Sequence, residues 1–257
     1  MALHYGSDYD QQIAEVGERQ LEARWRVPQQ VLLRHKSAGQ LLDLGCSSGG
    51  FLRSLKNQPW DLYGIEMSPK SAKTAEAASG AEVFVGDIID APYLADTFDA
   101  ITCFHVLEHM YHPREILTKV WEWLKPGGVF VVFLPNIDSG ASRVFRSYWY
   151  ALELPRHLYH FSPLTLRKMT GSIGFEELFL ATHREPFFEH STRYLIDEML
   201  QATGGSRVPL SRSKTPSFAW KLVRKVFRMA LLPVLDRAVA LSGPGEIIQA
   251  VFRKTVQ

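Results

Sequence analysis

A glycine-rich turn and an acidic side chain follow two apolar segments in the first third of the chain. The apolar run 40–44 stops at the turn GCSSGG of residues 45–50, and the next apolar run ends at Glu66. Such a turn exposes backbone N–H groups and lets a ligand approach the main chain closely, and the carboxylate can accept both hydroxyls of a ribose. The pair therefore predicts a site for a ribose-containing ligand. A dinucleotide is one alternative, although its fingerprint has a glycine where this chain has Ser47.

Three histidines are candidates for acid–base chemistry. His105 follows the apolar segment 98–104, and His157 and His160 lie in the segment LPRHLYHF of residues 154–161. Imidazole titrates near neutral pH and suits general-base catalysis. We expect His157 and His160 to contact the substrate, and His105 to lie at the sheet edge where open α/β folds bind ligands. The alternative for each is a structural histidine that bonds to the backbone or lies on the surface.

The elements that must position these residues alternate between strand and helix. We predict strands at residues 40–44, 61–66, 81–85, 98–104, 129–134, 174–181 and 246–253. We predict helices at residues 51–55, 68–78, 112–124 and 162–170, with one or two more across 10–36. This alternation predicts an α/β fold with a largely parallel sheet covered by helices on both faces. Residues 136–161 interrupt it, and we predict there an inserted loop over the site.

The composition narrows the classes of function. A net charge of +2 gives no signal for binding nucleic acid. The only cysteines, Cys46 and Cys103, lie in separate apolar stretches, so we expect buried thiols in a reducing cytoplasm. Residues 1–12 contain no apolar run of the signal-peptide type, and no apolar stretch approaches the roughly 20 residues that span a bilayer.

Basic charge is concentrated near the C-terminal end of the chain. Residues 206–237 contain eight Lys or Arg and one acid, which gives 8 − 1 = +7. Within this region, residues 217–232 show the pattern of an amphipathic basic helix. One hypothesis is a lid or a homodimer helix that packs its apolar face. The other is peripheral contact with an anionic membrane, which would give access to a lipid-linked acceptor.

Five motifs together resemble those of the class I S-adenosylmethionine-dependent methyltransferases. They are DLGCSSG at 43–49, YGIE at 63–66, GDI at 86–88, FD through HVLEH at 98–109, and LKPGG at 124–128. The family's first motif is Asp-x-Gly-x-Gly-x-Gly, so Ser47 is a departure. Residues 154–161 also resemble the subgroup of ubiquinone-pathway O-methyltransferases and of bacterial sugar and natural-product methyltransferases. The resemblance implies a Rossmann-like fold with a seven-stranded, mostly parallel sheet, N-terminal helices and a C-terminal helical insertion.

The same resemblance implies S-adenosylmethionine (SAM) as cofactor and assigns residues to each part of it. The methionine portion falls to Gly45, Ser47 and Gly49, the ribose to Glu66, and the adenine to Met67, Asp87 and Ile88. Two further assignments follow the family pattern. Asp43 contacts the cofactor's ammonium group or stabilises the turn, and Tyr5, with Tyr9, belongs to an N-terminal lid.

A divalent metal is an alternative role for the segment HVLEH. His105, Glu108 and His109 can present two imidazoles and a carboxylate on one turn, with His157 as a fourth ligand. Some relatives with Glu in place of His105 are thought to bind a metal here, whereas the same phrase in others only packs and caps. The sequence leaves the metal open.

The motifs, the element pattern and the charge distribution together predict the domain organisation and the function. We predict an N-terminal helical cap at 1–39, a SAM-binding core at 40–186 and 245–257, and a helical insertion or lid at 187–244. The predicted function is methyl transfer to a small-molecule or lipid-linked acceptor, by in-line displacement with a histidine base. The alternatives are a catalytically silent methyltransferase-like binding module and an NAD-dependent oxidoreductase.

Overall fold

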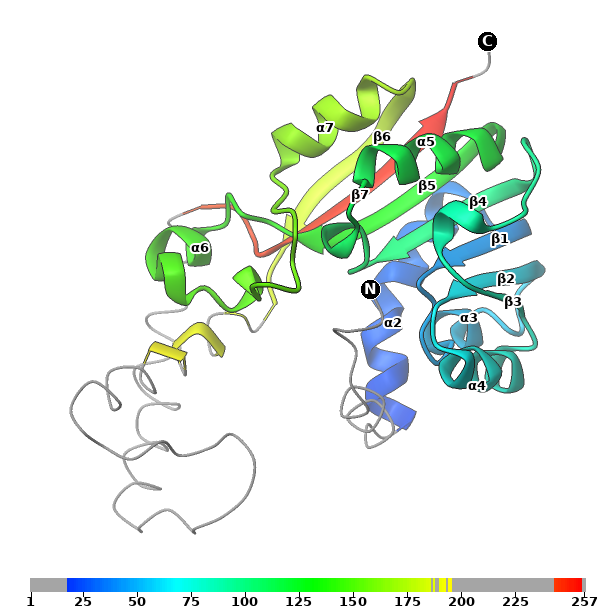
Figure 1. Cartoon of the computed structure of the whole chain (residues 1–257), viewed down its shortest axis with the longest axis horizontal. Coiled ribbons are helices and arrows are strands. Elements are labelled where there is room, and N and C mark those ends of the chain that lie inside the picture. Colours follow the sequence, from blue (N-terminus) through cyan, green and yellow to red (C-terminus); the bar gives the residue numbers. More distant parts are fainter. Residues whose placement is uncertain (1–17, 186, 188–189, 193, 196–242, 256–257) are drawn as a thin grey trace, which may run out of the picture. The chain divides into compact units, whose positions relative to one another are not determined.

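In the part of the chain that the structure describes, seven strands form one sheet in the order β3-β2-β1-β4-β5-β7-β6 (Figure 1). The computed structural model describes residues 18–185, 187, 190–192, 194–195 and 243–255. The strands are β1 Gly39–Leu44, β2 Trp60–Glu66, β3 Glu82–Val85, β4 Phe98–Phe104, β5 Leu124–Pro135, β6 Phe175–His183 and β7 Ile247–Lys254. The strand order reverses between β1 and β4, which is where open α/β sheets bind ligands.

The sheet is mostly parallel, as predicted. The pairs β1–β2, β1–β4, β2–β3 and β4–β5 are all parallel. β7 is antiparallel to β5, because Lys254 at its end bonds to Leu124 at the start of β5, whereas Glu246 before its start bonds to Asn136 after the end of β5. The predicted fold class, a seven-stranded Rossmann-like sheet with helices, is confirmed.

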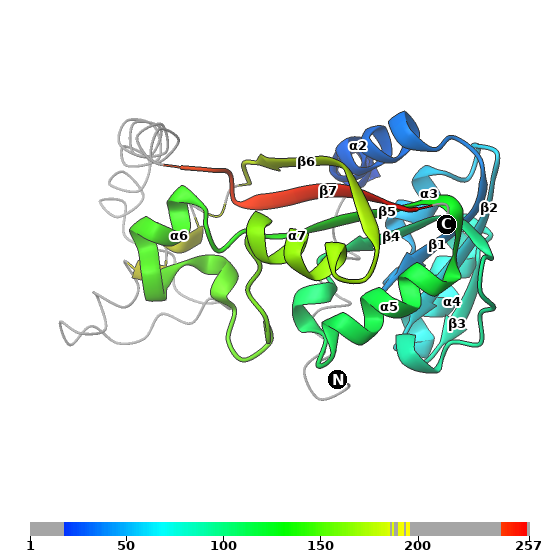
Figure 2. The same cartoon turned by 90° about the horizontal axis from the view of Figure 1, so that it is seen from above.

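Helices cover both faces of this sheet. The helices of the described residues are α2 Glu18–His35, α3 Gly50–Ser54, α4 Pro69–Ser79, α5 Pro113–Trp123 and α7 Pro163–Gly171, and in the second unit α6 Gly140–Phe145. Single 3-10 turns are η1 Ile88–Asp90, η2 Leu107–His109, η3 Arg146–Tyr148 and η4 Tyr150–Leu152. Figure 2 shows α2 on one side of the sheet and α5 with α7 on the other.

The start of α4 shows how local sequence ends a strand close to the site. The Ser68 hydroxyl accepts a hydrogen bond from the Ser71 amide at 3.3 Å, and Pro69 occupies the first turn, where a missing N–H costs nothing. Gly80 ends the helix with a φ of 77°, a conformation that glycine adopts without strain. The chain therefore leaves β2 at Glu66 and enters a capped helix within three residues.

The centre of the sheet is the main core. The inner strands β1, β4 and β5 are buried over most of their length, with Leu41, Ile101 and Phe130 at 0% exposure. Strands that are covered on both faces need nearly continuous apolar sequence, which these segments have. β5 begins at Leu124, earlier than the predicted start at 129, because Leu124 already pairs with Phe98 before a register shift in the pairing.

The chain divides into two units. The first comprises residues 1–134, 163–181 and 249–257, and the second comprises 135–162 and 182–248. In the second unit, the segment predicted as a loop at 136–161 instead contains α6, η3 and η4. Its apolar residues explain the difference, because Ala141, Phe145, Trp149 and Ala151 form a buried cluster of their own.

Several predicted features lie outside the described residues. These are the lid tyrosines Tyr5 and Tyr9, most of the insertion 187–244, and the basic segment 217–232. The predicted division into cap, core and insertion stays a prediction. Among the residues that the structure describes, no helix combines the length and the apolar character needed to cross a membrane.

Candidate active site

Every second residue of the turn between β1 and α3, from Gly45 to Gly49, has a left-handed backbone conformation. Gly45, Ser47 and Gly49 have φ values of 66°, 50° and 76°. A Cβ on Gly45 would lie 2.6 Å from a methyl carbon of Val106, and a Cβ on Gly49 would lie 2.7 Å from the Cα of Ala75. The two glycines are therefore required both by conformation and by close packing. The turn predicted from the sequence is present, with Ser47 as its one non-glycine left-handed residue.

Glu66 at the end of β2 is bonded to this turn. Its Oε2 accepts a hydrogen bond from the Ser47 amide at 2.9 Å, and its Oε1 accepts one from the Ser68 amide at 2.9 Å. Each carboxylate oxygen keeps a second lone pair, so the group can still accept ribose hydroxyls. The carboxylate is thereby held in one orientation at the carboxyl edge of the sheet.

Asp43 lies buried beneath the turn, on β1. The Thr102 hydroxyl of β4 donates a hydrogen bond to its Oδ1 at 2.7 Å. Burial raises the pKa of Asp43 to about 7; the hydrogen bond from Thr102 opposes this shift, and the Glu66 carboxylate adds to it. This environment favours the structural role of Asp43 in stabilising the turn. Sequence reasoning missed Thr102, whose signal was a hydroxyl residue in the middle of an apolar strand.

The residues implied for adenine lie at the ends of β2 and β3. Asp87 caps η1 by accepting a hydrogen bond from the Ile89 amide at 3.2 Å, and Ile88 is buried. Met67, next to Glu66, is 41% exposed, which is high for a methionine and leaves its side chain free to cover a flat ring. These assignments stay predictions, because their support is position and exposure.

His105 directly follows β4, the strand that neighbours β1 at the point where the strand order reverses. Its backbone has a φ of 57°, and its amide donates a hydrogen bond to the Phe133 carbonyl at 2.9 Å. The next residue, Val106, packs against Gly45 of the turn. The His105 side chain is 38% exposed. The structure therefore brings a strained, partly accessible histidine next to the predicted cofactor turn.

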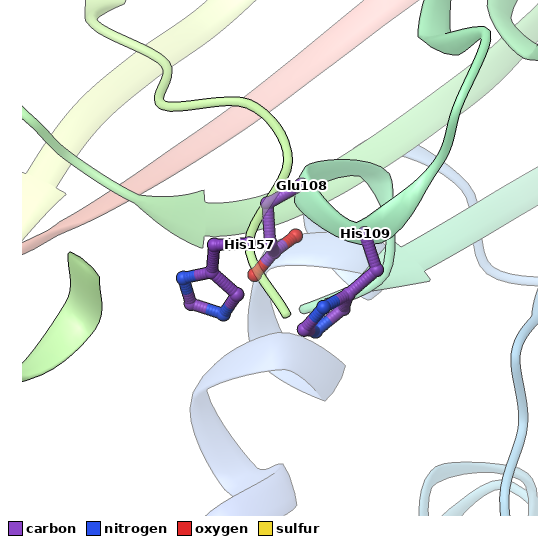
Figure 3. A group of neighbouring side chains, drawn as sticks. All are labelled: Glu108, His109 and His157. Atoms are coloured by element: carbon purple, nitrogen blue, oxygen red, sulfur yellow. The ribbon is translucent and has the colours of Figure 1, made fainter. Parts of the chain in front are cut away.

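Glu108 is the charged neighbour of His105. Oε1 of Glu108 lies 3.5 Å from Nδ1 of His105, and the Glu108 side chain is 2% exposed. This is an ion-pair distance rather than a hydrogen bond, and neither oxygen has a hydrogen-bond donor among the described residues. Burial alone would raise the pKa of Glu108, but the imidazoles of His105 and His109 together hold it below its ordinary value. Figure 3 shows Glu108 and His109 on the turn after β4.

His157 and His160 belong to the second unit, where both bond to their own segment. Nδ1 of His157 lies 2.7 Å from the Ala151 carbonyl, and its Nε2 lies 3.1 Å from a Glu153 carboxylate oxygen. Nε2 of His160 lies 3.1 Å from the Leu152 carbonyl. These contacts favour the structural role for both histidines. The metal hypothesis draws on ligands of both units and stays a hypothesis.

The chain is similar in sequence to known methyltransferases. A family model described as a methyltransferase domain matches residues 17–178. The mitochondrial ubiquinone biosynthesis O-methyltransferase of Schizosaccharomyces pombe is 26% identical over 149 residues, which cover 55% of this chain and 52% of that protein. The corresponding protein of Chromobacterium violaceum is 34% identical over 118 residues, covering 42% of this chain and 49% of that protein. The chain thus spans about half the length of these curated relatives.

Solved structures show the same fold. A SAM-dependent methyltransferase from Archaeoglobus fulgidus is similar with a TM-score of 0.60 and 18% identity, over 91% of this chain and 94% of that one. Phosphoethanolamine N-methyltransferase 2 of Haemonchus contortus, in complex with SAM, gives a TM-score of 0.59 and 16% identity, over 90% of this chain and 53% of that one. The domain match covers more than half of the chain. The chain therefore belongs to the methyltransferase domain family, and SAM is its cofactor.

Proposed function

We propose that the enzyme transfers the methyl group of SAM to a hydroxyl oxygen of a small-molecule or lipid-linked acceptor, with His105 as the general base. The observation that carries this proposal is the position of His105 at the end of β4, one residue before Val106, which packs on Gly45. Methyl transfer needs the nucleophile aligned with the sulfonium, and a hydroxyl nucleophile also needs a proton acceptor. The O-methyltransferase names of the curated relatives support oxygen as the acceptor atom.

In the proposed step, the methyl group moves from sulfur to the acceptor oxygen and the hydroxyl proton moves to His105. The acceptor oxygen bonds to the methyl carbon while the carbon–sulfur bond breaks, and the electron pair stays on sulfur in S-adenosylhomocysteine. The hydroxyl proton passes to Nε2 of His105, because Nδ1 is the ring nitrogen that faces Glu108. Glu108 then stabilises the protonated imidazole through its negative charge.

Binding and turnover separate this proposal from its alternatives. Calorimetry with SAM and with NAD distinguishes a methyltransferase from an oxidoreductase. A mass-shift screen of metabolite and lipid extracts with methyl-deuterated SAM then identifies the acceptor. A chain that binds SAM but labels nothing in these extracts would favour a silent binding module. Loss of turnover in a chelator, with recovery on adding a divalent cation, would favour the metal hypothesis over a direct base.

The membrane and homodimer hypotheses for residues 217–232 are part of the same proposal. A lipid-linked acceptor would require contact with a membrane surface, and this segment carries the basic and apolar residues for it. Co-sedimentation with anionic vesicles at physiological salt tests this, with Lys221→Glu/Arg224→Glu/Lys225→Glu as the control. Unchanged binding in the triple variant would favour the lid or homodimer role. Analytical ultracentrifugation would then measure whether the chain forms a dimer.

A further inference from the structure

Gly50 is the one glycine of the turn that its backbone conformation does not explain. Gly45 and Gly49 have positive φ values, whereas Gly50 does not. A Cβ on Gly50 would instead lie 2.6 Å from Nε1 of Trp25, well inside van der Waals contact with a rigid indole ring. Glycine at position 50 is therefore required by the side chain of Trp25, a residue of α2.

The same indole also reaches the end of β4. Its ring centre lies 5.7 Å from that of Phe104, the last residue of β4, and 5.7 Å from that of Phe51, the second residue of α3. The rings of Phe51 and Phe104 are 4.6 Å apart and meet edge to face, an arrangement that aromatic pairs prefer. One side chain of α2 thus contacts both the predicted cofactor turn and the residue before His105.

The turn is therefore joined at two places to the segment that carries the proposed base. The first contact is between Gly45 and Val106, and the second runs through Trp25 from Gly50 to Phe104. In the sequence the proposed base lies between Phe104 and Val106. A single contact would leave the end of β4 free to rotate against the turn, whereas two contacts on either side of the base restrict both its position and its orientation.

The indole nitrogen of Trp25 is buried and has no hydrogen-bond partner among the described residues. A buried donor without an acceptor is unfavourable, so shape and packing hold this ring in place rather than hydrogen bonding. Gln29, one turn later on α2, differs in this respect. Its Nε2 donates a hydrogen bond to the Ser54 carbonyl at the end of α3, at 2.9 Å. The Gln29 bond attaches α2 to α3 at the end of α3 that lies away from the turn.

We propose that Trp25 is a positioning residue for methyl transfer, which sets the distance between the glycine turn and His105. The inference rests on the proposed function, because it takes His105 as the base and the turn as part of the cofactor site. Methyl transfer depends on the alignment of the acceptor with the sulfonium, and a misplacement of about 1 Å can lower the rate about 10²-fold. Close-packed rigid rings resist such a displacement.

Kinetics and calorimetry on the full chain test this role, with an acceptor from the mass-shift screen. Trp25→Ala should lower kcat about 10²-fold, because the turn and His105 lose their fixed separation. Its affinity for S-adenosylhomocysteine should change less than about threefold, because the turn itself remains. Gln29→Ala loses the bond to Ser54, serves as the matched control on the same helix and should leave kcat unchanged.

Gly50→Ala provides a second test that keeps the indole. Alanine is a better helix former than glycine, so without the Trp25 contact this variant would be neutral or more stable. With the contact, the added methyl group displaces the ring and should lower kcat as well. Trp25→Ala removes the obstacle, so the double variant Trp25→Ala/Gly50→Ala should be no slower than Trp25→Ala alone.

The failures are distinguishable. Unchanged kcat in Trp25→Ala, or in Gly50→Ala if Trp25→Ala does not fold, would overturn the inference alone, as would single losses that multiply in the double variant. A fall in S-adenosylhomocysteine affinity as large as the fall in kcat would also overturn it, because Trp25 would then only support the turn. A wild-type chain that binds S-adenosylhomocysteine but methylates no acceptor would overturn the proposed function and this inference together.

Discussion

The amide of Ser47 donates a 2.9 Å hydrogen bond to Oε2 of Glu66, which joins the turn after β1 to the end of β2. Two segments that are predicted to contact different parts of one cofactor are thus held together by a single side chain. The second oxygen of that carboxylate bonds to Ser68, at the start of α4. These two hydrogen bonds hold the Glu66 carboxylate and the turn in fixed positions, which reduces the conformational entropy that is lost when a ligand binds.

Glu66→Ala should weaken the binding of SAM and S-adenosylhomocysteine by about 1.5–3 kcal/mol, because the ribose hydroxyls lose a charged acceptor. Calorimetry measures this directly. Glu82→Ala removes an exposed acid from the neighbouring strand β3 and serves as the matched control. Undiminished binding in a folded Glu66→Ala variant would remove Glu66 from the cofactor site.

His105→Asn should lower kcat by about 10²–10⁴-fold with little change in SAM affinity, because the proton acceptor is lost while the turn remains. Once the acceptor is found, steady-state kinetics checks this. His160→Asn is the matched control, since His160 bonds to the Leu152 carbonyl. If instead His157→Asn or His160→Asn abolishes turnover and His105→Asn does not, the base belongs to the second unit.

Asp43→Asn should stabilise the unliganded protein more at pH 8 than at pH 5. The pKa of Asp43 is about 7 in the folded chain and about 3.9 in an unfolded one. Between these values the unfolded state has released the proton while the folded state retains it, so wild-type stability falls as pH rises through this window. Each pKa unit corresponds to about 1.4 kcal/mol.

Urea unfolding at the two pH values measures the Asp43 effect. Asp61→Asn, at an exposed position of β2, is the matched control and should show no such change. The amide of the variant can still accept the Thr102 hydrogen bond, so the comparison isolates the charge. A stability difference that is the same at both pH values would refute the role of Asp43 ionisation.

Lys254→Met should lower the free energy of unfolding by about 1–3 kcal/mol. The Lys254 ammonium is buried, donates to Asp96 at 2.7 Å and to the Leu124 carbonyl at 2.9 Å, and lies 4.2 Å from the centre of the Trp121 ring. Its neighbour Arg253 pairs with Glu176 in solvent. Arg253→Met should therefore cost less than about 1 kcal/mol.

Chemical denaturation of both single variants compares the two cations on β7. The substitutions remove a charge from adjacent positions of the same strand, so differences in strand propensity are small. Equal losses of stability would show that the buried Lys254 ammonium stabilises the fold no more than the exposed Arg253–Glu176 pair does.

The sheet could be predicted from the sequence because each strand carries its own apolar signal. β4 was predicted with the bounds 98–104 that the structure has, whereas β5 starts earlier than predicted because of its pairing with Phe98. Such a start depends on the neighbouring strand, which a local pattern does not contain. The Lys254 contacts could not be predicted from a local pattern either, because their acceptors lie more than 120 positions earlier in the sequence.

The candidate site was predictable in part. The glycine turn and Glu66 appear as local motifs, and the structure places them in contact. The proposed choice of His105 among the histidines could not be predicted from the sequence, because it depends on which rings bond to backbone carbonyls and on the burial of Glu108. The partner of Asp43 also depends on register, which sets Thr102 beside it on β4.

The antiparallel β7 has a consequence for synthesis on the ribosome. β5 and β6 are not neighbours in the sheet, because β7 lies between them. Both are translated before β7, and residues 184–246 must also emerge before it can insert. Until then the outer side of β5 exposes unpaired backbone groups, which can pair with other nascent chains. The edge of β5 therefore stays open until β7 has been synthesised, and a molecular chaperone that shields strand edges would protect the nascent chain during that interval.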